Sequence, residues 1–223
     1  MNARHLFPAA LVLALVSSVP AFAQAPATPA IKAEPRWYLA AIGGAVSRPS
    51  GEPLFGVEIA EHIGRHGQAY FNVSYVENLM QPSLTDALDA KSAELSRFTG
   101  DRWAFSGRDR GVAAVAGGKY VFGSGIVRPY VGAGLGTIYL KRTIVDTRVG
   151  DVTQAVYNDF DLGDGDLSMS VEGITRPLAE AAFGVGIGTG RTHFDIGYRY
   201  RSAFRMDSKL DFSQVTAGIG YRF

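Results

Sequence analysis

Charged side chains recur at alternate positions inside segments that are otherwise rich in apolar residues. Arg199 and Arg201 flank Tyr200, for example, and Glu58 lies between two aliphatic residues. Seven ionisable residues, acids and bases together, have this setting: Glu58, Lys119, Glu180, Asp195, Arg199, Arg201 and Arg222. Alternate residues of an extended strand point to the same face, so such groups can lie in a row. A row of this kind can conduct protons or ions, or its members can neutralise one another as salt bridges.

A long polar segment, residues 142–176, is acidic and is a candidate for binding a divalent cation. Its carboxylates include Asp151, Asp159, Asp161, Asp164, Asp166 and Glu172. The run from Asp159 to Asp166 superficially resembles a calcium loop, but the EF-hand spacing of acids and glycine is not met. Asp-Gly pairs are also common in solvated turns. We therefore expect a solvated loop here, with neither a metal ion nor another cofactor.

A second long polar segment, residues 79–110, contains a helical pattern. Four apolar residues recur on one helical face: Leu84, Leu88, Leu95 and Phe98. Ser83 and Asp86 are placed to cap the first turn of this helix. The pattern predicts a short helix packed on the rim of the fold, and the alternative is an exposed adhesive surface.

Arginines are frequent in the second half of the same segment, at positions Arg97, Arg102, Arg108 and Arg110. A guanidinium group binds phosphate through two parallel hydrogen bonds, so phosphate groups are candidate partners. The alternative is ordinary loop charge that pairs with Asp101 and Asp109.

Most of the remaining chain consists of strand-like segments. Eight segments alternate apolar residues with polar or small ones, which is the period of a β-strand; they are residues 36–48, 53–62, 68–78, 111–122, 127–142, 177–189, 192–203 and 210–223. The first segment has apolar residues on both faces, so its orientation stays open. Connections after the second, fourth and sixth segments are short, whereas the others include the two long polar segments.

The last segment shows the two faces most clearly. Val215, Ala217, Ile219, Tyr221 and Phe223 alternate with Gln214, Thr216, Gly218, Gly220 and Arg222. An apolar face that ends in aromatic rings suits lipid, because such rings favour the membrane boundary. The alternative is a soluble carrier barrel, but glycine-rich faces would leave its outer surface bare of polar groups. We therefore predict an all-β fold, an eight-stranded antiparallel up-and-down transmembrane β-barrel, which satisfies every backbone hydrogen bond in lipid.

The N-terminus has the features of a signal peptide. Arg4 and His5 precede an apolar run, and Ala21-Phe22-Ala23 is a small-x-small cleavage site. We predict a signal peptide over residues 1–23 cut after Ala23, a disordered Ala/Pro-rich lead-in over residues 24–35, and the barrel over residues 36–223. The apolar run is shorter than the about 20 residues of a membrane-spanning helix.

The composition narrows the possible partners. The chain has 22 Lys and Arg against 21 Asp and Glu, and the predicted signal peptide contains one Arg and no acid. The remainder is formally neutral, which argues against nucleic acid as a partner. The absence of Cys excludes disulfides, thiolate metal sites and Cys nucleophiles.

The run Arg128-Pro129-Tyr130-Val131-Gly132-Ala133-Gly134-Leu135-Gly136 and the closing run from Ala217 to Phe223 resemble the small outer-membrane β-barrel family. This broad group includes opacity-type adhesins and OmpA/OmpX-like eight-stranded barrels. The resemblance covers about residues 37–223 and implies an outer-membrane location in a Gram-negative bacterium. It also implies that the C-terminal aromatic residues, Tyr221 and Phe223, form part of the signal read by the barrel-insertion machinery.

The resemblance leaves several activities open. Some eight-stranded barrels modify lipid A with a His and a Ser near the outer rim. The histidines beyond the signal peptide, His62, His66 and His193, all lie near short turns, at the predicted periplasmic end. We therefore expect no enzyme. A lumen of eight strands is only wide enough for side chains to fill it, so we expect the seven charged residues to form a plug and not an open pore.

The sequence therefore predicts a non-enzymatic surface protein whose barrel anchors two extracellular loops, residues 79–110 and 142–176. Its expected partners are outer-membrane lipid, lipopolysaccharide and the barrel-insertion machinery. An adhesin that binds a host or surface ligand through its loops is the first alternative. A small selective pore is the second, and a lipid A-modifying enzyme is the third.

Overall fold

The computed structural model describes residues 36–48, 51–159, 173–188, 190–205 and 208–223. The predicted signal peptide, its cleavage site and the lead-in lie outside these residues, and so does most of the acidic run that begins at Asp159. Those parts of the sequence analysis stay predictions.

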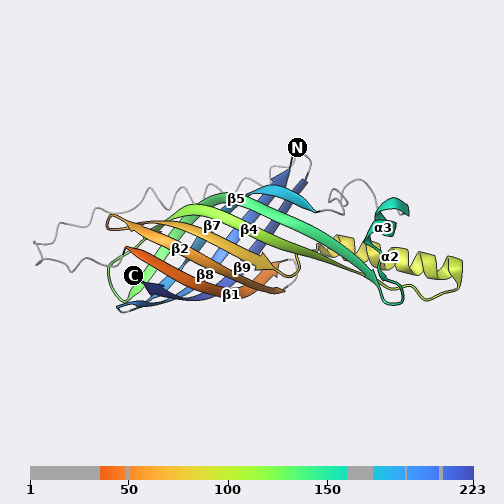
Figure 1. The fold of residues 1–223 in the computed structure, drawn as a ribbon, viewed down its shortest axis with the longest axis horizontal. Helices are drawn as coiled ribbons and strands as arrows, with labels where there is room; N and C mark the ends of the chain where they lie inside the picture. The colour runs from red at the N-terminus through yellow and green to blue at the C-terminus, as the bar shows by residue number, and fades with distance from the viewer. Residues whose placement is uncertain (1–35, 49–50, 160–172, 189, 206–207) are drawn as a thin grey trace, which may run out of the picture. The chain divides into compact units, whose positions relative to one another are not determined.

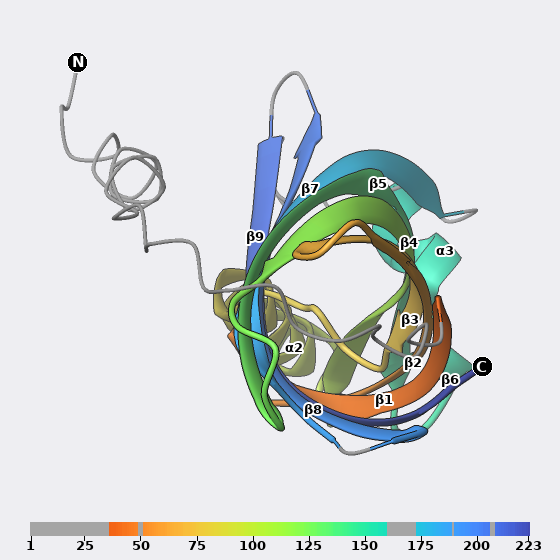
Figure 2. The ribbon, with the colours of Figure 1, turned by 90° about the vertical axis from the view of Figure 1, so that its left-hand side faces the viewer.

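The described residues form eight long strands that close into a ring (Figures 1 and 2). The strands are β1 (Trp37–Arg48), β2 (Pro53–Ile63), β3 (Gly67–Val76), β4 (Phe105–Val121), β5 (Val127–Asp146), β7 (Ile174–Ile187), β8 (Thr192–Arg205) and β9 (Ser208–Arg222). Each pairs in antiparallel fashion with its neighbours in the chain, and β1 pairs with β9 to close the sheet. The predicted fold class, an all-β eight-stranded up-and-down barrel, is confirmed.

The connecting elements divide the barrel into two different ends. The turn end has the connections at residues 64–66, 122–126 and 188–191, and both Trp37 and Phe223 lie there. The opposite end, here called the loop end, has the helices α2 (Pro82–Thr99) and α3 (Thr153–Asp159) and the two-residue strand β6 (Gly150–Asp151) (Figure 1). The predicted alternation of short and long connections is therefore present.

The alternation of side chains separates an apolar exterior from a mixed interior. On β1, whose orientation the sequence left open, Tyr38, Ala40 and Ile42 are buried inside, whereas Trp37 and Leu39 are exposed outside. Both faces of β1 carry apolar residues because these inward side chains join a buried apolar cluster, and the one polar group among them, the Tyr38 hydroxyl, has a polar partner. The hydrophobic pattern alone therefore could not assign its faces.

Strands β4 and β5 are longer at the loop end than their sequence pattern predicts. We expected them over residues 111–122 and 127–142, but residues 105–110 pair with residues 141–146. The extension is rich in charge, and for that reason it has the composition of a loop. Its inward residues Asp109 and Arg142 form a buried ion pair with oxygen–nitrogen distances of 2.7 and 2.8 Å. Because each charge has a partner, neither has to be solvated by water.

Helix α2 confirms the predicted helix but corrects its ends. The capping residue is Gln81, with Pro82 in the first turn, and no side chain caps the helix, so the Ser83–Asp86 cap is wrong. Proline suits this position because its fixed φ angle matches the helix. The helix ends at Gly100, whose φ of 73° allows its N–H to bond the Ser96 carbonyl. None of the described helices is long and apolar enough to cross a membrane.

The apolar face of α2 packs on the β4–β5 extension. Leu84 and Leu88 are buried with Met80, Phe105 and Ile144. Phe98 belongs to the same helical face by sequence, but it lies in the last turn and is 87% exposed. Leu95 is partly buried against the same cluster, so rim packing extends to Leu95 but not to the last turn, and the expectation for Phe98 was wrong.

We predict that Gly107 is needed for α2 to lie against β4. A Cβ atom there would lie 2.3 Å from Met80 Cε and 2.9 Å from Leu88 Cδ1. Gly107→Val should therefore raise hydrogen exchange in residues 84–96 by about tenfold or more, since local opening would cost less. The barrel should keep its heat-modifiable mobility on gels.

The matched control is Gly118→Val, because a Cβ at Gly118 would meet only the Gln68 carbonyl oxygen, at 3.8 Å. Exchange in the helix should be unchanged in this variant. Equal exchange in the two variants would contradict the proposed contact.

Candidate functional site

Glu58 is the centre of a buried ionic cluster inside the barrel. Its carboxylate is on β2, is 2% exposed, and accepts hydrogen bonds from the Tyr38 hydroxyl and the Lys119 ammonium group. Arg199 donates to the other oxygen of Glu58 at 2.7 Å. Lys119 also lies 5.0 and 4.8 Å from the ring centroids of Tyr70 and Tyr130, close enough for cation–π attraction.

Glu180, on β7, is the second buried carboxylate of the cluster. It accepts a hydrogen bond from Arg201 Nε at 2.6 Å and one from the Tyr70 hydroxyl at 2.7 Å. Arg199 Nη1 lies 3.5 Å from its Oε1, so Arg199 bridges the two carboxylates. Arg201 uses its remaining nitrogens to donate to Ser74 Oγ and Asn72 Oδ1, at 2.7 and 2.9 Å.

Five of the seven charged residues singled out from the sequence therefore lie together, and we call them the lumen core: Glu58, Lys119, Glu180, Arg199 and Arg201. Three cations face two carboxylates, and each carboxylate contacts at least two cations. Charges removed from water need such partners. The lumen core is thus a compact set of ion pairs across the interior.

Inward glycines make room for the tyrosines of the lumen core. A Cβ at Gly134 would lie 2.6 Å from the Tyr70 hydroxyl oxygen, and one at Gly184 would lie 2.5 Å from that of Tyr130. A larger residue at either position would push the ring away from Lys119. The glycine-rich inward faces of β5 and β7 thus complement rings that cross the lumen.

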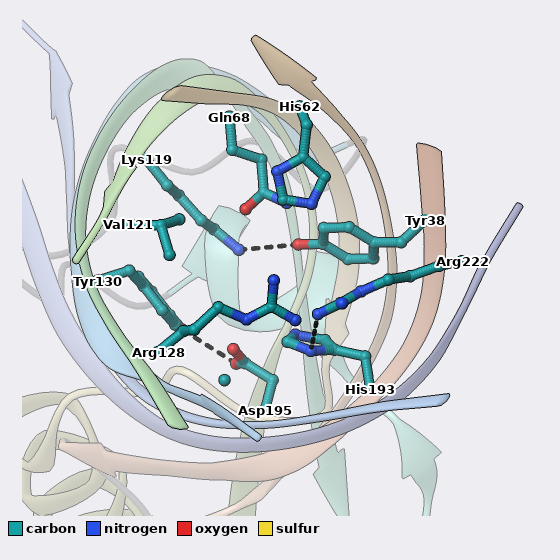
Figure 3. A pocket seen from close by; sticks show the side chains of 11 residues that line it. Tyr38, His62, Gln68, Lys119, Val121, Arg128, Tyr130, His193, Asp195 and Arg222 are labelled. Atoms are coloured by element: carbon teal, nitrogen blue, oxygen red, sulfur yellow. Dashed lines mark hydrogen bonds between the residues drawn. The ribbon is translucent and has the colours of Figure 1, made fainter. Parts of the chain in front are cut away.

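The other two charged residues lie apart from the lumen core. Asp195 accepts a hydrogen bond from the Tyr130 hydroxyl at 2.9 Å, and Arg222 bonds Nδ1 of His193 at 3.0 Å. Both residues line a cavity at the turn end (Figure 3). The expected single network is therefore divided into two groups at different depths.

Towards the loop end, the interior of the barrel is mainly apolar, although Asp109, Arg142 and Arg176 are also buried there. The buried residues there include Val46, Leu54, Val76, Ile138, Leu140, Leu178 and Phe212. The sequence analysis placed polar or small residues on the inward faces, and these apolar residues depart from that pattern. The sequence contained evidence for this apolar interior. Leu210 and Phe212 alternate with Asp211, and because Asp211 lies on the outer face of β9, the two apolar residues face the interior.

The arginines of the 79–110 segment have different environments. Arg108 and Arg110 point outward from β4 and lie 2.8 and 3.5 Å from Glu77 Oε1, whereas Arg97 and Arg102 are exposed. The hydrogen bond from the Tyr75 hydroxyl and the two arginines lower the pKa of Glu77, so it stays ionised. The two acids of the alternative interpretation have other partners: Asp101 pairs with Arg148, and Asp109 with Arg142.

In the described part of the acidic segment, the Asp151 carboxylate bonds a residue close to it in the chain. Asp151 accepts hydrogen bonds from the backbone N–H and the hydroxyl of Thr153, at 2.9 and 2.6 Å, and these bonds lower the pKa of Asp151. Among the described residues no group of His, Cys, Asp or Glu is arranged to hold a metal ion. Asp161, Asp164 and Asp166 lie outside the described residues.

Sequence reasoning missed the aromatic and basic residues that complete both groups: Tyr38, Tyr70, Tyr130, Arg128 and His193. The signal for Tyr70 was its position, since it alternates with Ala69 and Phe71 on the strand that also turns Asn72 inward. No pattern within one strand indicates which tyrosine meets which carboxylate, because the partners lie on different strands.

Solved structures confirm the fold. Neisserial surface protein A (NspA) is 15% identical, with 84% of this chain and 95% of that chain covered and a TM-score of 0.50. The N-terminal β-barrel domain of Pseudomonas aeruginosa OprF is 13% identical, with 85% and 98% covered and a TM-score of 0.52. No family model matches the chain, and no curated protein matches it with significant similarity. At these identities the likeness establishes the small barrel architecture alone.

We predict that Glu58→Gln destabilises the barrel strongly. The change leaves Lys119 and Arg199 buried with one carboxylate fewer, and breaking a buried ion pair in this way costs about 3–5 kcal/mol. The free energy of unfolding in urea, measured for the barrel in lipid vesicles, checks this.

Glu61→Gln on the same strand is the matched control. Glu61 lies 3.5 Å from Arg36, whose side chain is 77% exposed, and such a pair contributes about 0–1 kcal/mol. A loss in Glu58→Gln no larger than the loss in Glu61→Gln would show that the lumen core does not stabilise the fold.

Proposed function

We propose that this protein is a non-enzymatic outer-membrane anchor of a Gram-negative bacterium that displays its loop-end segments on the cell surface. The turn end lies in the periplasm and the loop end faces outside. The observation that carries the proposal is the filled lumen. An ionic layer and an apolar layer occupy the interior, so we infer that the barrel is an anchor and not an open channel.

The outer face of the barrel supports a lipid environment. Large apolar residues are exposed around the ring, among them Phe55, Leu135, Phe183 and Ile196, and Leu135 is 70% exposed. Contiguous apolar surface of this extent marks contact with lipid or another protein. A closed sheet with such a surface satisfies its backbone hydrogen bonds and can therefore lie in a bilayer.

The position of the histidines supports a non-enzymatic role. His62, His66 and His193 belong to strands or turns at the turn end. Chemistry on lipid in the outer leaflet would require a base at the loop end, where the described residues contain no histidine. Histidine is the most frequent general base beside a hydroxyl nucleophile.

The loop end supports a role in surface contact. Arg97 and Arg102 are exposed there beside Phe98, which gives α2 a basic and aromatic tip. Arginine pairs well with phosphate, so lipopolysaccharide is the partner that we propose for this tip. An adhesin that binds a host ligand through the same tip is the second candidate, because an exposed aromatic ring favours protein contact.

The last strand supports assembly by the barrel-insertion machinery. Tyr221 and Phe223 are exposed on its outer face, 48% and 61%, while Arg222 between them points inward. We propose that these two rings are the part of the strand that the machinery recognises.

We predict that the purified protein shows no sustained nanosiemens-scale conductance in planar bilayers. The ion pairs of the lumen core cross the interior, and eight strands enclose a lumen that side chains fill. Steady channels of that size in the unmodified protein would support the small-pore alternative and contradict the anchor.

We also predict that the loop end is exposed on intact cells. The chain lacks Cys, so single cysteines can be labelled without background. Arg102→Cys at the loop end should react with a membrane-impermeant maleimide on intact cells. Ser124→Cys, equally exposed but at the turn end, should react only after lysis. The reverse pattern would overturn the orientation, and no protection of either residue would overturn the membrane location.

A further inference from the structure

A cavity at the turn end lies outside the lumen core and has no role in the function proposed above. About 330 Å³ at this place is free of protein atoms, and that space includes open solvent. Every strand of the ring contributes to its lining, through Tyr38, His62, Gln68, Lys119, Val121, Arg128, Tyr130, Gly186, His193, Asp195 and Arg222. Its inner wall includes Tyr38 and Lys119, which both bond Glu58, so the cavity ends at the lumen core (Figure 3). We call it the turn-end chamber.

The turn-end chamber carries an excess of positive charge. Arg128, Arg222 and Lys119 line it, whereas Asp195 is the only carboxylate among the described residues of its lining. Asp195 accepts a hydrogen bond from Tyr130. Among the described residues, no carboxylate lies within ion-pair distance of Arg128 or Arg222, although these side chains are only 8% and 6% exposed. Two buried guanidinium groups therefore lack an anionic partner.

The chamber holds one of these groups in a defined position. Arg222 Nη2 donates to Nδ1 of His193 at 3.0 Å, and the buried Arg222 Nε has no partner among the described residues. The His193 ring lies against Gly186, where a Cβ atom would come within 2.5 Å of its Cε1. The lack of a side chain at Gly186 thus leaves room for the His193 imidazole, and this imidazole orients the Arg222 guanidinium.

Figure 3 shows the side chains of Arg128 and Arg222 extending from different strands towards the middle of the same chamber. Arg128 is on β5 and Arg222 is on β9, so the two reach it from separate parts of the ring. Like charges repel when they share a site that excludes water, and an uncompensated buried charge is costly. An anion between them would remove both costs.

We propose that the turn-end chamber binds a phosphate group through Arg128 and Arg222. A guanidinium offers two parallel N–H groups that match two phosphate oxygens, and two guanidiniums match the charge of an inorganic phosphate dianion, whereas the phosphodiester of a headgroup neutralises one of them. The lumen core closes the chamber from within, so the ligand enters from the turn end. Its source is either free inorganic phosphate or the headgroup of a phospholipid.

Calorimetry on the folded full-length barrel in nonionic detergent tests the proposal. Inorganic phosphate, titrated to about 20 mM, should give a saturable heat with one site, since this range saturates a site whose Kd is about 1 mM. Arg128→Gln and Arg222→Gln should each weaken binding by about tenfold or more. Arg128→Lys keeps the positive charge but loses the paired N–H donors of the guanidinium, so it should weaken binding by less than Arg128→Gln does.

Arg65→Gln is the matched control, because Arg65 is exposed in a turn at the same end. It removes the same charge and should leave binding unchanged. Heat-modifiable gel mobility confirms that each variant is folded, and Arg128→Gln keeps the test valid if Arg222→Gln fails to fold, since Arg128 is not in the closing strand.

Glycerophosphoethanolamine, titrated in parallel, distinguishes the two sources. Binding of inorganic phosphate alone supports the free ion, and binding of the diester supports a headgroup. The proposal is overturned if neither compound gives a saturable heat, or if Arg128→Gln binds as tightly as the unmodified protein. Because these experiments use isolated barrels, they do not depend on which end faces the periplasm.

Discussion

Arg199 holds the interior of the barrel together. Its guanidinium is 1% exposed and contacts both buried carboxylates, Glu58 at 2.7 Å and Glu180 at 3.5 Å. A planar guanidinium has five donors in a fixed fork, so it can satisfy two acids on different strands at once. Glu58 is on β2 and Arg199 on β8, which do not pair in the sheet. The ion pairs therefore connect strands that backbone hydrogen bonds do not.

Such a cluster is better explained by specificity than by net stability. Well-packed apolar residues can replace a buried ion pair with little loss, so charge is not required to fill the lumen. The charges can, however, specify the register of the strands, because a slip of one residue turns every side chain of a strand to the opposite face. In the bilayer that we propose for this barrel, a slip of β8 would place Arg199 and Arg201 in lipid, where a charge near the midplane costs about 2–4 kcal/mol. The lumen core thus penalises the wrong pairing.

The sequence predicted what depends on one strand and missed what depends on several. Alternation within β8 was sufficient to place Arg199 and Arg201 inside, because their neighbours are aromatic. It could not separate Arg222 from the lumen core, since depth along the barrel is set by register between strands. It also misplaced the start of β4. The charge of Asp109 suggested a solvated loop, but Asp109 pairs with Arg142 within the sheet. Partners distant in sequence change the meaning of a charged residue.

The last strand shows how a period of two allows two roles in one segment. Tyr221 and Phe223 point outward, and Arg191 donates to the Tyr221 hydroxyl at 3.0 Å on that side. Arg222 points inward and is held by His193. Because the faces are separated by the sheet, a requirement for terminal aromatic rings leaves the inward residue free to vary. An arginine there needs a separate reason, and the phosphate that we propose for the turn-end chamber would supply it.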